Sequence, residues 1–152
     1  MKSYKLFFTL LLSTFFVFFL SCSNDDNNED GIVGTWNFTK VEADAAANSD
    51  LDRIKEQLKR EDFSPKITFL GNNTFKTFHT NEANNEEGTY VYKDNTLTLY
   101  WNGDKENSDT YGATVSGNTL KIEDDNTEDY KAHDFPNSGV TKAITVFYFT
   151  RQ

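Results

Sequence analysis

From Gly31 onward, apolar and polar residues alternate with a period of two, and β-branched and aromatic side chains dominate the apolar positions. Such alternation is typical of strands that bury one face of a sheet. Short turn sequences separate the alternating segments, namely Gly71-Asn72-Asn73, Asp94-Asn95 and Gly117-Asn118. These residue types tolerate the positive φ angles of tight hairpins. The pattern therefore predicts an all-β chain whose consecutive strands pair antiparallel.

The alternation predicts eight strands, at residues 33–41, 66–70, 74–80, 88–93, 96–101, 110–116, 119–123 and 141–151. Because hairpins join most of them and long crossovers are absent from the pattern, a doubly wound parallel sheet is excluded. A closed barrel and a two-sheet sandwich remain. A meander of eight strands removes its own edges by closing on itself, which favours an up-and-down antiparallel barrel.

One segment, NSDLDRIKEQLKRED, follows a helical period instead. Leu51, Ile54 and Leu58 fall on one helical face, and charged residues fill the others. Ser49 and Asp52 resemble a capping box at its start. We therefore expect one short helix at residues 50–60, between the first and second strands, lying on the barrel rather than inside it.

The N-terminal segment has the pattern of an export signal. Lys2 and Lys5 precede a largely apolar run of 15 residues, Leu6 to Leu20, which is shorter than the about 20 residues that span a bilayer as a helix. The single cysteine of the chain, Cys22, directly follows the small residue Ser21. We therefore expect residues 1–21 to be a cleaved signal peptide.

The residues around Cys22 resemble the lipobox of bacterial lipoproteins, in which the signal is cut before the cysteine and the cysteine is acylated. A buried thiol is disfavoured because the following tract SNDDNNED is polar. A disulfide within the chain would need a second cysteine. The resemblance implies a lipoprotein signal peptide at residues 1–21, lipid attachment to the membrane at Cys22, and an acidic flexible tether at residues 22–31.

The acidic residues after Cys22 also bear on where the protein is located. Asp25, Asp26, Glu29 and Asp30 resemble the acidic export tract of surface lipoproteins in Bacteroidota, and a solvated spacer would have the same composition. Ser23 rather than aspartate follows the cysteine, unlike the inner-membrane retention signal of enteric bacteria. These resemblances imply an outer membrane lipoprotein that is exposed at the cell surface.

The charge of the mature chain restricts its partners. Cleavage after residue 21 would remove Lys2 and Lys5 and shift the formal net charge from −9 to −11. So acidic a chain is not expected to bind nucleic acid or to make broad contact with anionic lipid. The remainder, residues 32–152, forms one domain of a size that buries about two thirds of its unfolded surface without needing disulfides.

Gly34-Thr35-Trp36 opens the first predicted strand, and Arg151 lies at the end of the last. This resembles the calycin signature, in which the tryptophan of a G-x-W motif packs at the closed end of a barrel against an arginine from the last strand. A guanidinium over an indole gains a cation–π contact while its N–H groups satisfy backbone carbonyls. The resemblance implies that Trp36 and Arg151 form the barrel floor.

Further segments resemble, in the same order, the lipocalin-like domain of Bacteroidota lipoproteins. They are ITF at 67–69, TF at 74–75, GTY at 88–90, NTLTL at 95–99 and GNTL at 117–120. The resemblance covers essentially the whole mature chain. It implies an eight-stranded lipocalin-like barrel, with a small hydrophobic ligand as an expected partner.

Alternation places one face of each strand inward, and the inward positions are rich in rings. The expected inward set is Trp36, Phe38, Ile67, Phe69, Phe75, Tyr90, Tyr92, Leu97, Leu99, Trp101, Tyr111, Val115, Leu120, Ile122, Phe147 and Phe149. A barrel of eight strands is either filled by its side chains or holds one small ligand. The residues expected to line a ligand cavity are Phe69, Phe75, Tyr90, Tyr92, Leu99, Trp101, Tyr111 and Phe147.

The sequence lacks the patterns of a catalytic centre. No G-x-S-x-G elbow, Gly-rich phosphate loop or zinc-ligand spacing occurs, and His133 lies in a segment expected to be a polar loop, residues 124–138. We therefore expect no enzymatic activity, no metal and no cofactor. Two functions remain. The first is a lipid-anchored cell-envelope protein that binds a small apolar or amphipathic ligand in its barrel, and the second is a ligand-free lipoprotein whose loops contact another envelope protein.

Overall fold

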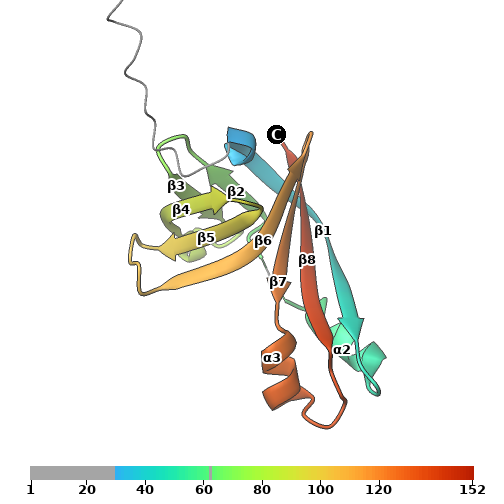
Figure 1. Ribbon diagram of the computed structural model, residues 1–152. Helices are drawn as coiled ribbons and strands as arrows, with labels where there is room; N and C mark the ends of the chain where they lie inside the picture. The colour runs from blue at the N-terminus through green and yellow to red at the C-terminus, as the bar shows by residue number, and fades with distance from the viewer. Residues whose placement is uncertain (1–29, 62) are drawn as a thin grey trace, which may run out of the picture.

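The computed structural model describes residues 30–61 and 63–152, which form a closed barrel (Figure 1). Its strands are β1 (Gly34–Ala46), β2 (Lys66–Phe69), β3 (Thr74–Phe78), β4 (Glu87–Lys93), β5 (Thr96–Trp101), β6 (Ser108–Ser116), β7 (Thr119–Asp125) and β8 (Lys142–Arg151). Each strand pairs antiparallel with its neighbours in sequence, and β8 pairs back onto β1. The eight-stranded up-and-down barrel, with one short helix after its first strand, is thus confirmed.

The hairpins depend on the residues that tolerate positive φ. Between β4 and β5, Asp94 and Asn95 have φ angles of 53° and 58°. Two consecutive left-handed residues make a turn whose twist matches that of the flanking strands. Gly117, with φ 57°, serves the hairpin between β6 and β7. Local turn chemistry therefore sets the order in which the strands pair.

The barrel has two different ends. At the floor, the short 3-10 turn η1 (Asp30–Ile32) lies beside the start of β1 and the end of β8, whereas α2 (Leu51–Leu58) and α3 (Thr127–Asp129) lie beyond the opposite end (Figure 1). We call that opposite end, where β3 and β5 end and β4 and β6 begin, the mouth. The interior between them is filled by one apolar core of Ile32, Trp36, Ile67, Phe69, Phe75, Tyr90, Tyr92, Leu97, Leu99, Ala113, Leu120, Ile122, Phe147 and Phe149.

One residue of the expected inward set is placed differently. Phe38 is 37% exposed, although its ring still meets that of Phe149 edge to face, with centroids 5.8 Å apart. The pairing of β1 with β8 shifts between Phe38 and Lys40. A bulge of this kind inserts an extra residue and restarts the alternation, so that the odd-numbered Val41 packs against the core next.

Past the bulge, β1 and β8 continue as a long ribbon beyond the barrel. β1 extends to Ala46, five residues further than expected, and Ala46 pairs with Lys142. The ribbon carries a second core made of Ile54, Leu58, Tyr130, Phe135, Val140 and Ala143, with Ala43, Ala45 and Ala47 packed against it. The narrow apolar stripe of α2 is therefore buried on this ribbon.

The segment expected to be a polar loop, residues 124–138, is helical in part. It contains α3 and the π-helical turn η3 (Tyr130–Asp134). The rings of Tyr130 and Phe135 stack with centroids 5.7 Å apart, and both are buried in the second core. Two rings in a strongly charged tract were too few to produce a helical period in the sequence.

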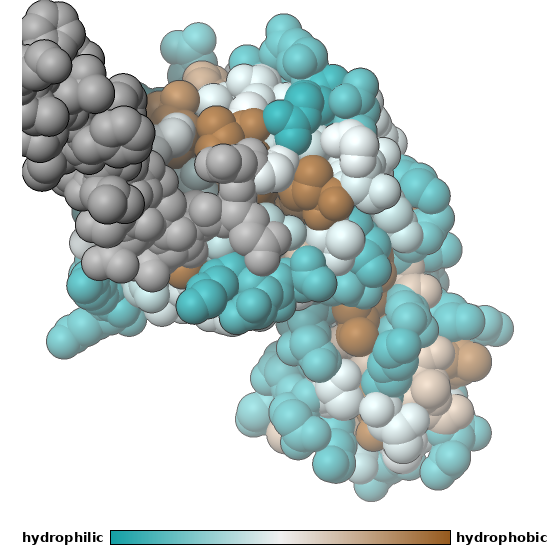
Figure 2. Space-filling model, turned by 45° about the horizontal axis from the view of Figure 1, so that its top comes forward, coloured by the Kyte–Doolittle hydropathy of each residue, from teal (hydrophilic) through white to brown (hydrophobic). Residues whose placement is uncertain are grey.

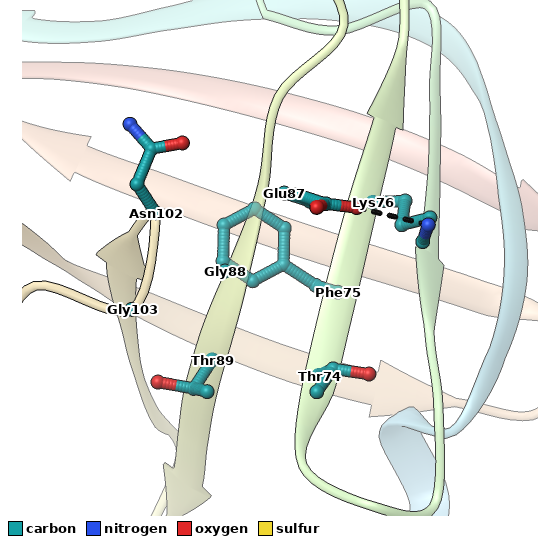
Figure 3. Close-up of a pocket in the computed structure, with 8 residues that line it drawn as sticks. All are labelled: Thr74, Phe75, Lys76, Glu87, Gly88, Thr89, Asn102 and Gly103. Carbon is teal, nitrogen blue, oxygen red and sulfur yellow. Dashed lines mark ion pairs between the residues drawn. The ribbon is translucent and has the colours of Figure 1, made fainter.

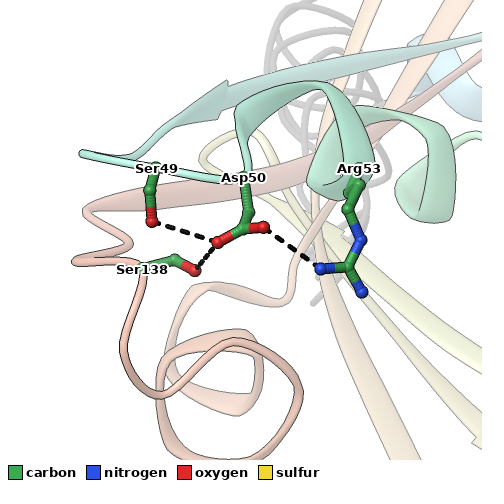
Figure 4. Close-up of polar contacts among 4 residues, drawn as sticks. All are labelled: Ser49, Asp50, Arg53 and Ser138. Carbon is green, nitrogen blue, oxygen red and sulfur yellow. Dashed lines mark hydrogen bonds and ion pairs between the residues drawn. The ribbon is translucent and has the colours of Figure 1, made fainter.

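The start of α2 does not form the expected capping box. Asp50 precedes the helix in a left-handed conformation, with φ 57° and no side-chain hydrogen bond to the helix backbone. Its carboxylate instead accepts hydrogen bonds from the Ser49 hydroxyl (3.0 Å), from the Ser138 hydroxyl (2.7 Å) and from Arg53 (3.1 Å) (Figure 4). Asp50 thus joins α2 to the connection before β8.

Few large apolar side chains are exposed among residues 30–61 and 63–152. On the face that Figure 2 shows, apolar residues form several separate patches among hydrophilic ones. The large apolar residues that stand exposed are Phe38 and Leu70. Among residues 30–61 and 63–152, no helix combines the length and the apolar character needed to cross a bilayer.

Candidate binding site at the barrel mouth

Most of the residues expected to line a ligand cavity pack against one another. Phe69, Phe75, Tyr90, Tyr92, Leu99 and Phe147 each keep 2% or less of their surface exposed. The ring centroids of Phe69 and Tyr90 lie 4.9 Å apart. A side chain that lined a ligand-sized cavity would keep surface within reach of a water molecule. The lower and middle barrel is therefore filled at these positions.

The two buried tyrosines also have partners for their hydroxyls. Tyr90 donates to the carbonyl of Leu70 at 3.0 Å, and Tyr92 donates to the carbonyl of Ala113 at 3.5 Å. Buried hydroxyls need such partners. Both tyrosines thus serve the packing of the barrel, and their polar tips point at backbone.

At the floor, the guanidinium of Arg151 lies over the Trp36 ring, 4.3 Å from its centroid. Arg151 donates to the carbonyls of Val33 (2.7 Å) and Gly31 (2.6 Å), and the Trp36 indole donates to the carbonyl of Ile32 at 2.8 Å. Gly34 has φ 144°, and a Cβ there would lie 3.0 Å from an Arg151 nitrogen. The glycine of G-x-W thus leaves room for the arginine.

The other two expected residues, Trp101 and Tyr111, border a hollow at the mouth. The hollow has a volume of about 180 Å³ and is lined by Phe63, Ser64, Thr77, His79, Glu86, Trp101 and Tyr111. Trp101 and Tyr111 are half-buried, and Glu86 is exposed. The hollow therefore combines ring faces with an opening to solvent, an arrangement that suits a small amphipathic molecule.

Phe63 forms the base of this hollow although it belongs to no strand. Its ring lies 5.1 Å from that of Phe147, 5.6 Å from that of Phe149 and 5.9 Å from that of Tyr111. The next residue, Ser64, fastens the connection, because its hydroxyl donates to the Lys66 carbonyl (2.7 Å) and accepts the Phe78 N–H (3.1 Å). Phe63 thus separates the hollow from the filled core.

The walls of the hollow are held by hydrogen bonds. The Trp101 indole donates to a carboxylate oxygen of Asp109 at 2.6 Å. Thr77 donates from its hydroxyl to the Glu86 carbonyl (3.2 Å) and accepts the Glu86 N–H (2.8 Å). These contacts fix the indole and the backbone that carries Glu86 relative to β3 and β6.

The electrostatic environment of the mouth is negative. Burial raises the pKa of the Tyr111 hydroxyl above its ordinary value, and the charges of Asp109 and Asp124 raise it further, with Glu86 acting in the same direction. Burial also raises the pKa of the Asp124 carboxyl, with added contributions from Glu61 and Asp109. Four carboxylates therefore lie near this region. They are Asp109 on β6, Asp124 on β7, Glu86 directly before β4 and Glu61 in the connection after α2.

A larger hollow, of about 360 Å³, lies on the outer face of the barrel between β3 and β4 (Figure 3). Lys76 and Glu87 form an ion pair of 2.9 Å across it, and the Phe75 ring lies at Gly88. A Cβ on Gly88 would lie 2.9 Å from that ring and 2.0 Å from the Tyr100 carbonyl oxygen. The hollow lies where β3, β4 and β5 approach closely. Its charged residues, Lys76 and Glu87, already pair with each other.

Neither histidine belongs to a cluster that could hold a metal ion in the described part of the chain. His133 lies 2.8 Å from the Asp129 carboxylate on the exposed side of η3, and His79 borders the mouth hollow. Among residues 30–61 and 63–152, no group of three or more His, Cys, Asp and Glu side chains is placed to hold a metal ion. Cys22, the expected lipid attachment site, lies outside the described residues.

Sequence reasoning did not identify Phe63, Glu86, Asp109 or Asp124 as mouth residues. A usable signal existed for three of them. Asp109 stands two positions before the inward Tyr111, and Asp124 stands two positions after the inward Ile122. Glu86 stands two positions before Gly88. The same alternation, continued past the apolar residues, places these carboxylates on the inward side; Phe63 lies in a connection and follows no period.

The comparisons with known proteins agree with this architecture. The chain matches the family model described as a lipocalin-like domain over residues 32–122, more than half of its length. The match runs from η1 into β7. Comparisons with curated proteins and with solved structures each gave no significant match. The family match and the closed eight-stranded barrel lead to one conclusion: this chain belongs to the lipocalin-like domain family.

Proposed function

We propose that this chain is a lipid-anchored binding protein of the cell envelope, which holds a small amphipathic molecule at the mouth of its barrel. The hollow lined by Phe63, Trp101 and Tyr111 carries the proposal. Membership of a lipocalin-like family supports a ligand-binding role. The mouth is a better candidate than the barrel interior because the interior positions are filled.

The size of the hollow restricts the ligand. A dry cavity of about 150 Å³ in another protein holds one benzene molecule, and the hollow at the mouth has about 180 Å³. We therefore expect a molecule with one ring, or an alkyl group of similar volume, and a polar end that remains in solvent. A long acyl chain would need Phe63 to leave its place against Phe147 and Phe149.

The location belongs to the same proposal. Acylation of Cys22 would hold the protein at the outer membrane, exposed at the cell surface, and residues 22–31 would serve as the tether. The lipobox-like residues around Cys22 and the acidic tract after it support this address. The proposed role is binding rather than catalysis, since neither a nucleophile elbow nor a metal-ligand spacing occurs in the sequence.

The two tryptophans of the chain supply a test. Trp101 borders the hollow, whereas Trp36 is fully buried at the floor. A ligand at the mouth should change the tryptophan fluorescence of the natural chain and leave that of a Trp101→Phe variant, which reports Trp36 alone, unchanged. A panel of single-ring amphipathic compounds that leaves both signals flat would refute binding at the mouth.

The filled interior also favours a second function, that of a structural or interaction lipoprotein whose loops contact another envelope protein. Its support is the near-zero exposure of six of the eight expected lining residues. Cross-linking in cells followed by identification of the bound partner tests it. A reproducible partner together with a flat Trp101 response would decide for this second function.

A further inference from the structure

We infer that the mouth of the barrel selects organic cations, so that its ligand is a small aromatic or alkyl ammonium compound. The inference rests on the proposed function, because it names the ligand class of the same hollow. It depends on where four carboxylates lie relative to the rings of Trp101, Tyr111 and Phe63.

Three of these carboxylates follow from strand register. Midway along β6 and β7 the paired inward side chains are Ala113 and Ile122, both buried. The same faces continue to Asp109 and Asp124 at the mouth. Ahead of β4, Glu86 lines the hollow itself. The inward surface therefore changes from apolar at the floor to acidic at the mouth.

The fourth carboxylate, Glu61, is held in place from three sides. Thr145 donates to it at 2.5 Å, Asn126 at 3.1 Å and Tyr130 at 3.4 Å. Thr145 is fully buried on β8. Thr145 pairs with Asp124 across β7 and β8. Glu61 therefore holds a negative charge in a fixed position near Asp124, and this charge raises the pKa of the Asp124 carboxyl.

In the part of the chain that the structure describes, no lysine or arginine is among the residues that line the hollow. Among the described residues that line it, His79 alone can carry a positive charge. The outer hollow between β3 and β4 differs, because there Lys76 and Glu87 pair at 2.9 Å. Carboxylates that face one another without a cation repel, and a bound ammonium group would relieve that repulsion.

The aromatic rings at the mouth also favour a cationic ligand. An ammonium group over the face of an indole or phenol is attracted by the ring, and quaternary ammonium ligands are recognised by aromatic cages. Trp101 and Tyr111 offer such faces beside Asp109, to which the Trp101 indole is bonded. A carboxylate ligand of the same size would meet the same four negative charges and be repelled.

The experiment compares three probes that share one ring and differ in charge: phenylethylammonium, phenylethanol and phenylacetate. Their affinities are measured by calorimetry on the full-length chain in a neutral detergent at low salt. We expect phenylethylammonium to bind at least about tenfold more tightly than phenylethanol, and phenylacetate to bind most weakly. The advantage of the cation should shrink as salt is added.

Neighbouring residues provide the matched control. Glu86→Gln and Glu87→Gln each remove one negative charge, the first from the mouth and the second from the outer face. Glu86→Gln and Asp109→Asn should each reduce the affinity for phenylethylammonium severalfold more than the affinity for phenylethanol. Glu87→Gln should leave both affinities unchanged.

The possible results distinguish a wrong cation preference from a wrong proposal that the mouth binds a ligand. If phenylethanol binds as tightly as phenylethylammonium, with a Trp101 response, the mouth binds ligands and the cation preference is wrong. If Glu87→Gln lowers the affinity for phenylethylammonium as much as Glu86→Gln does, the overall negative charge of the protein attracts the cation rather than the mouth. The inference is then again wrong. If none of the three probes binds, the inference falls together with the proposed function.

Discussion

At the scale of single residues, Arg151 combines more interactions at the floor than any neighbour described above. It lies over the Trp36 ring at 4.3 Å and donates to two backbone carbonyls. We expect Arg151→Ala to lower the free energy of unfolding by about 2 to 4 kcal/mol, from one cation–π contact and two charge-assisted hydrogen bonds. Urea denaturation measures the loss.

The variant Arg151→Lys separates charge from geometry. Lysine keeps the positive charge over Trp36 but lacks the planar fork that reaches Val33 and Gly31 together. Its stability should lie between those of the natural chain and Arg151→Ala. Equal stability of Arg151→Lys and the natural chain would show that the fork contributes nothing.

Gly88 is required by space rather than by its φ angle. A Cβ there would lie 2.0 Å from the Tyr100 carbonyl oxygen and 2.9 Å from the Phe75 ring, whereas a Cβ at Gly71 meets nothing within 4 Å. Gly88→Ala should therefore cost about 1 to 3 kcal/mol of unfolding free energy through overpacking. Gly71→Ala is the control, and a cost at Gly71 equal to that at Gly88 would contradict this explanation.

At the scale of elements, the strands could be predicted from the sequence and the second core could not. The strands alternate between inward apolar side chains and outward side chains, as with the inward Leu97, Leu99 and Trp101 on β5. By contrast, η3 and the residue after it bury Tyr130 and Phe135 within an otherwise polar tract. Their burial depends on α2, which is distant in sequence, and no local period records such a contact.

Asp50 fastens α2 to the connection before β8, and its contribution depends on pH. Hydrogen bonds from Ser138, Ser49 and Arg53 hold the pKa of its carboxyl below the ordinary value (Figure 4). The stabilisation is therefore present above the unfolded pKa of about 3.9 and is lost as the pH falls through the lower folded pKa. Asp50→Asn should destabilise the protein near pH 6 and differ less from the natural chain as the pH falls.

Asparagine is the appropriate substitution at this position because it tolerates the left-handed backbone that Asp50 adopts, with φ 57°. Asp52→Asn removes the same charge from the first turn of α2 and serves as the control. Urea midpoints of the three chains, measured between pH 2.5 and about pH 6, give the comparison. A constant difference between Asp50→Asn and the natural chain over this range would contradict a role for the carboxylate's charge.

At the scale of the whole molecule, the sequence predicts which way side chains point but not how much space they leave. Period two assigned Phe69, Phe75, Tyr90 and Tyr92 on β2, β3 and β4 to the interior, and they are buried there. Whether the rings meet or enclose a cavity depends on the barrel's width and on Phe63, which enters from a connection without a period. The candidate site therefore moved from the barrel interior to its mouth, and two of the eight expected residues, Trp101 and Tyr111, remain beside it.

The proposed attachment of the barrel at the cell surface belongs to the same scale, and it depends on Cys22. Expression of the full chain in a bacterium that processes lipoproteins, with a labelled fatty acid, tests acylation directly. The natural chain and a Ser23→Ala control should carry the label and fractionate with membranes, since two or more acyl chains give stable attachment. Cys22→Ala should carry no label and lose membrane retention. If Cys22→Ala is labelled and retained like the control, lipid attachment at this cysteine is wrong, and the mouth would bind its ligand from some other location.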